Sequence, residues 1–287
     1  MKVSTAVFPV AGLGSRFLPA TKANPKEMLP IVDKPLIQYA VEEAVKAGIT
    51  HMIFITSSSK RAIEDHFDNN FELEARLKEQ NKKQLLSIVE DISPKGVKFS
   101  YVRQHQALGL GHAISCAEHV VGDNPFAVLL ADDLIDDTTA PCLEAMVESY
   151  NQYSNSIIAV QQVPHEEVYK YGVVDTADNN ARFANIKDMI EKPSPKEAPS
   201  NLVAIGRYVF EPAIFQYLAK TSFDERGEIQ LTNAIKAMLK TRTVNAYQYQ
   251  GVRYDCGSKL GYLKASIELG LKHPEVGTQL KEYLNSC

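Results

Sequence analysis

Short apolar runs that end in glycine or aspartate recur along the chain, and they predict buried strands of a parallel sheet. Residues 3–10 are closed by the glycine-rich stretch 11–14, and residues 126–131 stop abruptly at two aspartates. Strands that are buried on both faces have this pattern. Residues 37–45 instead place apolar side chains at three- and four-residue steps, which predicts an amphipathic helix. With the apolar run 52–56 these elements form a strand–helix–strand unit, so its two strands are expected to be parallel.

The alternation of strands and helices continues to the end of the chain, with one exception. Residues 71–90 are rich in Glu, Lys, Gln and Leu and contain neither glycine nor proline, so we expect a solvent-facing helical insertion there. The other predicted strands cover residues 97–102, 156–163 and 202–210, and the other predicted helices cover residues 111–121, 141–153, 229–239, 259–271 and 278–284. No flexible linker divides the chain. We therefore predict one α/β domain over residues 1–287, with a nucleotide site at the carboxyl ends of its parallel strands.

Composition narrows the class of protein. With 287 residues and 45% hydrophobic content, the chain can bury a core without disulfides or a structural metal. The formal net charge of -4 lacks the basic excess of a protein that binds nucleic acid. The four cysteines are far apart and form no CxxC pair, which fits a reducing compartment, and the N-terminal apolar run is too short for a membrane span. We therefore expect a cytoplasmic protein whose partners include neither nucleic acid nor a membrane.

The loop after the first predicted strand carries the first candidate chemistry. It contains Gly12, Gly14 and Arg16, followed by Lys22 and Lys26. Glycines let backbone N–H groups approach phosphate oxygens, and the cations supply counter-charge, so the pattern favours a polyphosphate site over a simple tight turn. The loop is not a dinucleotide fingerprint, because phenylalanine stands where the third glycine would be, and no GK[ST] follows to make a Walker A loop. We expect Lys26 to be an exposed cation of this loop.

Two aspartates end the predicted strand 126–131. A carboxylate at the carboxyl end of a buried strand can hold a divalent metal in an open α/β sheet, so Asp132 is a candidate ligand. Asp133 can instead cap the following turn, and capping by both residues is the alternative interpretation. Further along, Glu191 and Lys192 precede a proline, and by themselves they are typical of a surface ion pair beside a turn.

A set of ordered short motifs runs through essentially the whole chain. They are AGLGSRFLPATK at 11–22, PKEMLP at 25–30, VDKP at 32–35, Gln104, GLGHA at 109–113, LADD at 130–133, YG at 171–172, IEKP at 190–193, YDCG at 254–257 and GY at 261–262. Together these motifs resemble the signature of the bacterial UTP–glucose-1-phosphate uridylyltransferases. Ser15 stands where that family usually has threonine, and Cys256 lies inside one motif, but neither departure affects the reaction.

The resemblance implies a fold, a reaction and a set of site residues. The fold is a Rossmann-like nucleotidyltransferase fold, with a mostly parallel mixed central sheet flanked by helices, in a homodimer or homotetramer. The reaction transfers the uridylyl group of UTP to α-D-glucose 1-phosphate, giving UDP-glucose and pyrophosphate, with Mg²⁺ as cofactor. The implied catalytic residues are Arg16, Lys26, Asp132 and Lys192, the metal ligands are Asp132 and Asp255, the nucleotide-binding residues are Ala11, Gly12, Gly14, Glu27, Gln104, Gly109 and Asp133, and the sugar-binding residues are Gly172, Glu191 and Lys192.

The chemistry of nucleotidyl transfer fits these residue types. The nucleophile is a phosphate oxygen that is already anionic, so no Ser, Cys or His nucleophile is required, and the main barrier is repulsion between two polyanions. A side-chain amide such as Gln104 can match the N–H and carbonyl groups of uracil, although Gln104 could equally be an exposed residue at a strand end. His112 is expected to be packed or hydrogen-bonded rather than catalytic.

Two alternative functions remain open at this point. One is a thymidylyltransferase or another hexose-1-phosphate nucleotidyltransferase, which would share the glycine-rich, Glu-Lys-Pro and aspartate motifs. The other is a non-catalytic regulatory domain that binds a nucleotide sugar. The presence of Lys26, Asp132, Lys192 and Asp255 argues against the non-catalytic alternative.

Overall fold

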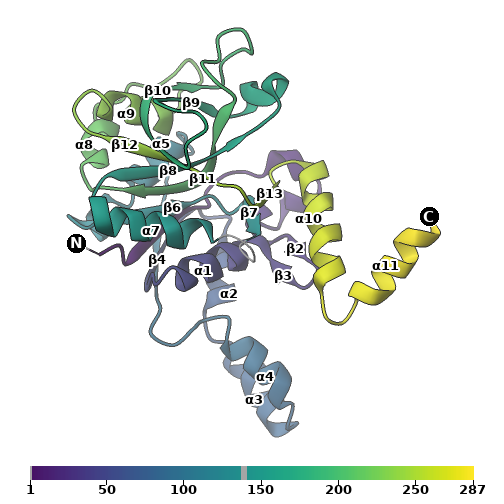
Figure 1. The fold of residues 1–287 in the computed structure, drawn as a ribbon. Coiled ribbons are helices and arrows are strands. Elements are labelled where there is room, and N and C mark those ends of the chain that lie inside the picture. The colour runs from purple at the N-terminus through teal and green to yellow at the C-terminus, as the bar shows by residue number, and fades with distance from the viewer. Residues whose placement is uncertain (1, 137–140) are drawn as a thin grey trace.

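The computed structural model describes residues 2–136 and 141–287, and at its centre lies a mixed sheet with helices on both faces (Figure 1). Nine strands form this sheet within the described residues. In spatial order they are β5 (Lys98–Arg103), β4 (His51–Thr56), β1 (Thr5–Pro9), β6 (Phe126–Leu129), β11 (Leu202–Phe210), β8 (Ser156–Gln162), β12 (Val244–Gln248), β10 (Phe183–Glu191) and β9 (Gly172–Thr176).

The pairing confirms the predicted mixed sheet. Strands β5, β4, β1 and β6 pair in parallel, as do β12 and β8. Strand β11 is antiparallel to β6 and β8, and β10 is antiparallel to β12 and β9. The antiparallel share is larger than the sequence suggested, because β11 runs antiparallel to β6, β8 and β9, and because β10 and β12 escape the sequence pattern. Strand β10, for example, is buried only at Ile186 and Met189 and carries several polar residues, so it lacks a continuous apolar run.

Each face of the sheet contributes to its own hydrophobic layer. One layer packs against α1 (Leu36–Lys46), α2 (Arg61–Phe67) and α7 (Cys142–Tyr153), and the other packs against α5 (Leu110–Ser115), α6 (Glu118–Val121), α8 (Ile214–Leu218) and α9 (Leu231–Met238). Strand β1 shows why the chain folds this way. Ala6 and Phe8 enter the first layer and Val7 enters the second, so the strand must be apolar at every position.

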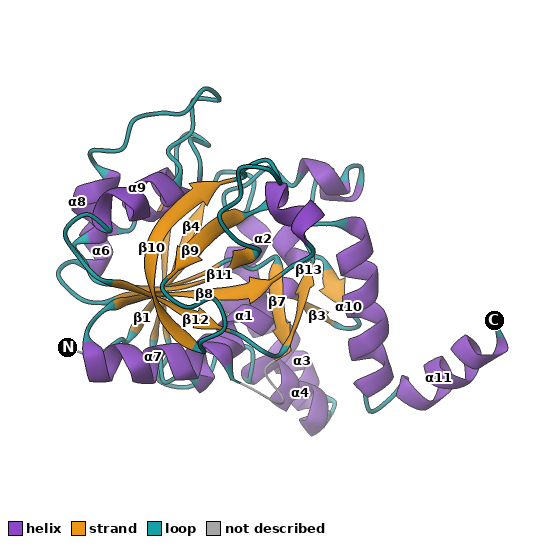
Figure 2. Cartoon of the chain, turned by 45° about the horizontal axis from the view of Figure 1, so that its top comes forward, coloured by secondary structure: helices purple, strands orange, loops and turns teal. Residues whose placement is uncertain are grey.

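Several helices lie outside these layers. The predicted insertion at 71–90 forms two helices, α3 (Phe71–Glu79) and α4 (Lys83–Glu90), which project from the sheet and are separated near Asn81, where φ is 55° (Figure 1). The chain ends in α10 (Lys259–Lys272) and α11 (Gly277–Ser286), and α11 points away from the rest of the molecule (Figure 2). The short 3-10 helices are η1 (Ser15–Phe17), η2 (Ala20–Lys22), η3 (Lys26–Met28) and η4 (His165–Lys170). None of the helices in the described ranges has the length and apolarity that a bilayer span needs.

Two small sheets lie beside the central one. Strands β2 (Pro30–Ile31) and β3 (Lys34–Pro35) pair with each other, and β7 (Asp133–Asp136) pairs antiparallel with β13 (Val252–Asp255). These strands are too short for the sequence pattern to identify. The second sheet nevertheless matters for the site, because its register sets Asp133 opposite Asp255. Asp133 therefore begins a strand, whereas the sequence allowed it to cap the turn that follows β6.

A buried arginine ties α1, β11 and the turn at residues 130–133 together. The Arg207 side chain is only 1% exposed, and its guanidinium donates to both carboxylate oxygens of Glu43 at 2.8 to 3.0 Å. The same guanidinium donates to the carbonyl oxygens of Leu130 at 2.9 Å and Asp133 at 2.7 Å. Because a buried charge must be paired and hydrogen-bonded, this arrangement fixes the backbone on either side of Asp132.

We predict that Arg207→Met destabilises the protein strongly. The substitution removes the charge partner of Glu43 and frees two carbonyl groups, and breaking a buried ion pair of this kind costs about 3–5 kcal/mol. The matched control is Arg242→Met, which removes an arginine whose side chain is 45% exposed in its ion pair with Glu211. That change should cost less than about 1 kcal/mol. Urea denaturation measures both, and equal losses of stability would contradict the role given to Arg207.

Candidate active site

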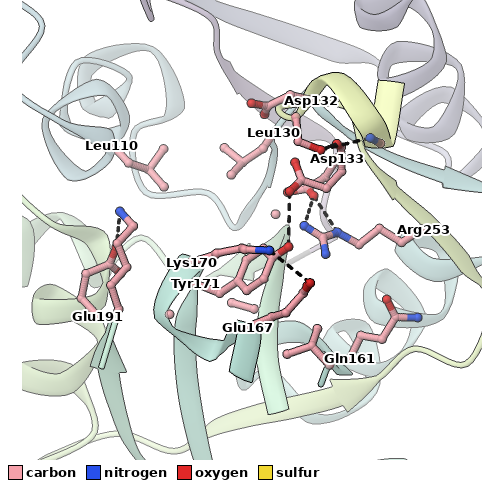
Figure 3. A pocket seen from close by; sticks show the side chains of 18 of the residues that line it. Leu110, Leu130, Asp132, Asp133, Gln161, Glu167, Lys170, Tyr171, Glu191 and Arg253 are labelled. Atoms are coloured by element: carbon pink, nitrogen blue, oxygen red, sulfur yellow. Dashed lines mark hydrogen bonds and ion pairs between the residues drawn. The ribbon is translucent and has the colours of Figure 1, made fainter. Parts of the chain in front are cut away.

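Two adjoining hollows meet at the carboxyl ends of β1 and β6. The larger is a cleft of about 850 Å³ that reaches from Arg16 and Asp132 to Glu191 and Lys192 (Figure 3). The smaller, of about 180 Å³, lies under the glycine-rich loop. Arg16 and Asp132 line both hollows, so they stand where ligands in the two spaces would touch.

The glycine-rich loop is held against η3 and α10. Gly14 has a φ of 67°, which favours glycine, and a Cβ there would lie 3.3 Å from side-chain atoms of Lys26 and Thr21. The Thr21 hydroxyl donates to the Gly14 carbonyl at 2.6 Å. Arg16 donates to the carbonyl of Gly257 at 3.2 Å, which links the loop to the residues that precede α10. The loop is therefore anchored at both ends of the smaller hollow.

Lys26 and Asp132 form an ion pair at the junction of the hollows. Lys26 Nζ lies 2.6 Å from Asp132 Oδ2, and each side chain is only 25% exposed, so the prediction of an exposed loop cation is wrong. Burial opposes charge on both groups. The Asp132 and Glu27 carboxylates nevertheless raise the pKa of Lys26, and Lys26 lowers the pKa of Asp132. Both groups are charged near neutral pH. Because the pair is mostly buried, its electrostatic field is screened less than it would be in water.

Asp132 and Asp255 face a common gap that Gly257 leaves open. A Cβ on Gly257 would lie 3.1 Å from Asp132 Oδ2, 3.0 Å from Asp255 Oδ1 and 3.1 Å from a guanidinium nitrogen of Arg16. Asp255 is fixed by two bonds, from the Gly257 backbone N–H at 3.1 Å and from the Tyr171 hydroxyl at 3.3 Å. Across residues 2–136 and 141–287 there is no group of three or more His, Cys, Asp or Glu side chains that could hold a metal. The carboxylates that face this gap are those of Asp132 and Asp255.

Asp133 faces a different partner from its neighbour. Its carboxylate accepts from Arg253 Nε at 2.6 Å and also contacts the second nitrogen of that guanidinium, and in Figure 3 the Asp132 carboxylate points away from Arg253. Burial raises the pKa of Asp133, although Arg253 works against the shift. The carboxylate also lies against Gly206, where any Cβ would overlap it. Asp133 thus lines the cleft while its carboxylate is paired with Arg253.

The residues assigned to the sugar come together at the far end of the cleft. Gly172 begins β9 and pairs with Glu191, the last residue of β10. The Glu191 carboxylate lies 2.9 Å from Lys192 Nζ and accepts from the Thr232 hydroxyl at 2.6 Å. Lys192 has a φ of 45°, an uncommon conformation for a non-glycine residue and one that tends to occur at functional sites. A Cβ on Gly172 would lie 2.8 Å from Met189 Cε and 3.2 Å from the Thr232 hydroxyl oxygen, so side chains surround this position closely.

Four residues assigned to the nucleotide lie beside the hollows rather than along their walls. Gln104 is 6% exposed at the end of β5, and its amide nitrogen lies 2.8 Å from His112 Nδ1 and 3.3 Å from the Gly109 carbonyl. Glu27 is 2% exposed and pairs with Lys60 at 2.9 Å, and burial raises the pKa of Glu27. The other Glu27 oxygen, Oε1, is buried and has no hydrogen-bond partner among the described residues. The remaining two are Gly109, whose carbonyl accepts from Gln104, and Ala11, which is buried.

Sequence reasoning missed several residues that hold this site together. They are Lys60, Tyr171 as a partner of Asp255, Arg207, Thr232 and Arg253. Each acts through a contact with a residue far away in the chain, so spacing carries no signal for it. Tyr171 is a partial exception, because it belongs to the motif at 171–172, but that motif did not indicate its contact with Asp255.

Comparisons with known proteins agree with this geometry. Residues 6–270 match the family model described as nucleotidyl transferase. The chain is 49% identical over 283 residues to the UTP–glucose-1-phosphate uridylyltransferase of Bacillus subtilis strain 168, covering 99% of this chain and 96% of that protein. It is similar in structure to a UTP-bound UGPase from Acinetobacter baumannii, with a TM-score of 0.92, 46% identity and 98% of each chain covered.

A second solved structure contains the product-like ligand. It is a UDP-glucose pyrophosphorylase complexed with UDP-glucose, with a TM-score of 0.86, 46% identity, and coverage of 94% of this chain and 100% of that one. The family match spans most of the chain, and the relatives are covered almost completely. On these grounds, and with its glycine-rich loop and strand-end aspartate facing one cleft, the chain belongs to the nucleotidyl transferase family.

Proposed function

We propose that this protein transfers the uridylyl group of UTP to α-D-glucose 1-phosphate, giving UDP-glucose and pyrophosphate. Relatives with this name share about half of its residues over nearly the whole chain, and similar structures hold UTP and UDP-glucose. The observation that carries the proposal is the junction of the two hollows. Arg16 and Asp132 line both, and the Lys26 ammonium lies on Asp132, so a nucleotide phosphate and a sugar phosphate would meet at this point.

The smaller hollow and its surroundings would bind UTP. Gly12 and Gly14 offer backbone N–H groups to the phosphates, and Arg16 and Lys26 offer positive charge. We assign the base and ribose to Ala11, Glu27, Gln104 and Gly109, which lie beside the hollows, and Asp133 lines the neighbouring cleft. At the opposite end of the cleft, the Glu191 carboxylate would accept hydrogen bonds from hexose hydroxyls, Lys192 would bind the sugar phosphate, and Gly172 would leave room for the ring.

The reaction would be a direct displacement at the α-phosphorus of UTP. An anionic oxygen of glucose 1-phosphate forms the new P–O bond while the bond to the bridging oxygen of pyrophosphate breaks, so no side chain has to remove a proton. Repulsion between the two anions is the main barrier. Arg16, Lys26 and Lys192 lower it by placing three positive charges around the reacting phosphates, in a cleft where water screens them less than in bulk solvent.

Mg²⁺ is the proposed cofactor, and the residues present fit it. Asp132 and Asp255 direct hard oxygen donors into one gap, and magnesium is commonly held by one or two carboxylates together with substrate phosphates and water. When bound, the ion would neutralise charge on the polyphosphate. We further propose that the protein works in the cytoplasm as a homodimer or homotetramer, as a single nucleotidyltransferase domain, with small-molecule substrates rather than nucleic acid or membranes as partners.

The test of this function is a substrate panel. Purified protein is given UTP, dTTP, CTP or ATP with glucose 1-phosphate, galactose 1-phosphate or mannose 1-phosphate, with and without magnesium, and pyrophosphate release is followed. We expect the highest kcat/KM with UTP and glucose 1-phosphate, and a requirement for the metal. A higher kcat/KM with dTTP would favour a thymidylyltransferase, and no release with any pair would contradict an enzymatic function.

We predict different kinetic changes for Glu191→Ala and Lys192→Ala. Loss of the Glu191 carboxylate should lower discrimination between glucose 1-phosphate and galactose 1-phosphate about tenfold, because a hexose hydroxyl loses its acceptor. Loss of the Lys192 charge should raise KM for every sugar phosphate about 10- to 100-fold, the cost of one charged hydrogen bond. The control is Lys170→Ala, which removes a lysine that lines the same cleft but pairs with Glu167. Identical profiles for the first two variants would contradict this division of roles.

A further inference from the structure

The side-chain amide of Gln104 is held at one end only. Its nitrogen, Nε2, lies 2.8 Å from His112 Nδ1 and 3.3 Å from the carbonyl oxygen of Gly109. The residue is 6% exposed, at the point where β5 ends beside β4. Among the residues that the structure describes, none donates a hydrogen bond to the amide oxygen Oε1. The two ends of this amide therefore have different surroundings.

Two neighbouring groups, the Gly109 carbonyl and the His112 imidazole, determine the orientation of the amide. The Gly109 carbonyl can only accept, so the NH₂ end of Gln104 must be the end directed at it. His112 Nδ1 accepts from the same NH₂ group when the imidazole carries its proton on Nε2, and this contact is the shorter of the two. A carbonyl and an imidazole nitrogen together hold the amide, and they leave Oε1 as the free acceptor.

Helix α5 fixes the position of His112. Gly111 lies so close to residue 229 that a Cβ on it would stand 2.7 Å from the Ile229 carbonyl oxygen. The Gly111 N–H donates to that oxygen at 2.9 Å, and the Ile229 N–H donates to the Leu108 carbonyl at 2.8 Å. The first turn of α5 is thus bonded on both sides to a segment far away in the chain. These contacts fix the backbone that carries His112 beside Gln104.

We propose that His112 is a positioning residue for base selection, which rests on the proposed function and on Gln104 as the residue that meets the base. His112 holds Gln104 so that Oε1 accepts the N3–H of uracil. Cytosine has an unprotonated N3 at the same place, so an oxygen acceptor disfavours it. If the amide turned over, its N–H would instead favour cytosine. The orientation of one amide thereby separates UTP from CTP.

The experiment compares kcat/KM for UTP and CTP in wild type, His112→Phe, His112→Ala and His112→Asn, with glucose 1-phosphate saturating. Loss of the acceptor in the Phe and Ala variants should lower the UTP-to-CTP ratio about tenfold, the scale of one misdirected hydrogen bond. The change should appear in KM for UTP, with KM for glucose 1-phosphate unchanged. Asn places an acceptor near the former Nδ1, so it should restore most of the ratio, whereas a packing role would make Phe the better substitute.

A double-mutant cycle with Gln104→Ala completes the test. If His112 acts through Gln104, His112→Ala should change the ratio no further in the Gln104→Ala background. An unchanged ratio in both His112→Phe and His112→Ala, or an equal loss in the Gln104→Ala background, would overturn the role of His112 while leaving the enzyme's function standing. No pyrophosphate release by wild type from UTP and glucose 1-phosphate would overturn the proposed function itself, and the role of His112 with it.

Discussion

The buried guanidinium of Arg207 is the interaction on which the site depends. It neutralises Glu43 of α1 and binds the carbonyl groups of Leu130 and Asp133, so the turn between β6 and β7 has one allowed path. That path directs the Asp132 carboxylate to Lys26 and the Asp133 carboxylate to Arg253. The two aspartates therefore differ in pKa: Lys26 lowers that of Asp132 against the effect of burial, and burial raises that of Asp133 in spite of Arg253. One buried cation outside the cleft thus holds the turn that carries both aspartates.

The site would act by placing charged groups around the substrates rather than by using a nucleophilic side chain. Two substrates with several negative charges must approach each other, and the protein meets them with cations from three places: the glycine-rich loop, η3 and the end of β10. In the proposed mechanism the Asp132 and Asp255 carboxylates would hold a divalent cation, and Tyr171 and the Gly257 N–H position Asp255. Lys26 and Lys192 are held by carboxylates of the site, and Arg16 and Asp255 by neighbouring groups, so little reorganisation would be needed during the reaction.

The sequence predicts the elements that have a clear local pattern. It does not predict those that depend on contacts between residues far apart in the chain. Buried strands such as β1 and β6 and the amphipathic α1 follow from local patterns, and so does the glycine-rich loop. Strands β7 and β13 have four residues each and include charged ones, so their pairing has no local signal. The ion pair of Lys26 is missed for the same reason, since its partner lies 106 residues away. Motif likeness names Asp132 and Asp255 together, but only the fold directs both at the gap beside Gly257.

The central claim is that Asp132 and Asp255 hold magnesium where the phosphates meet. The most direct measurement is a magnesium titration of the initial rate for Asp132→Asn and Asp255→Asn, with melting curves. The control is Asp188→Asn, which changes a half-buried aspartate that pairs with Lys236. Asparagine keeps the shape and removes the charge, so we expect both variants to stay folded, to lose about 100-fold or more in rate, and to need more magnesium for half-maximal rate. Rates equal to wild type at ordinary magnesium concentrations, in folded variants, would contradict the account.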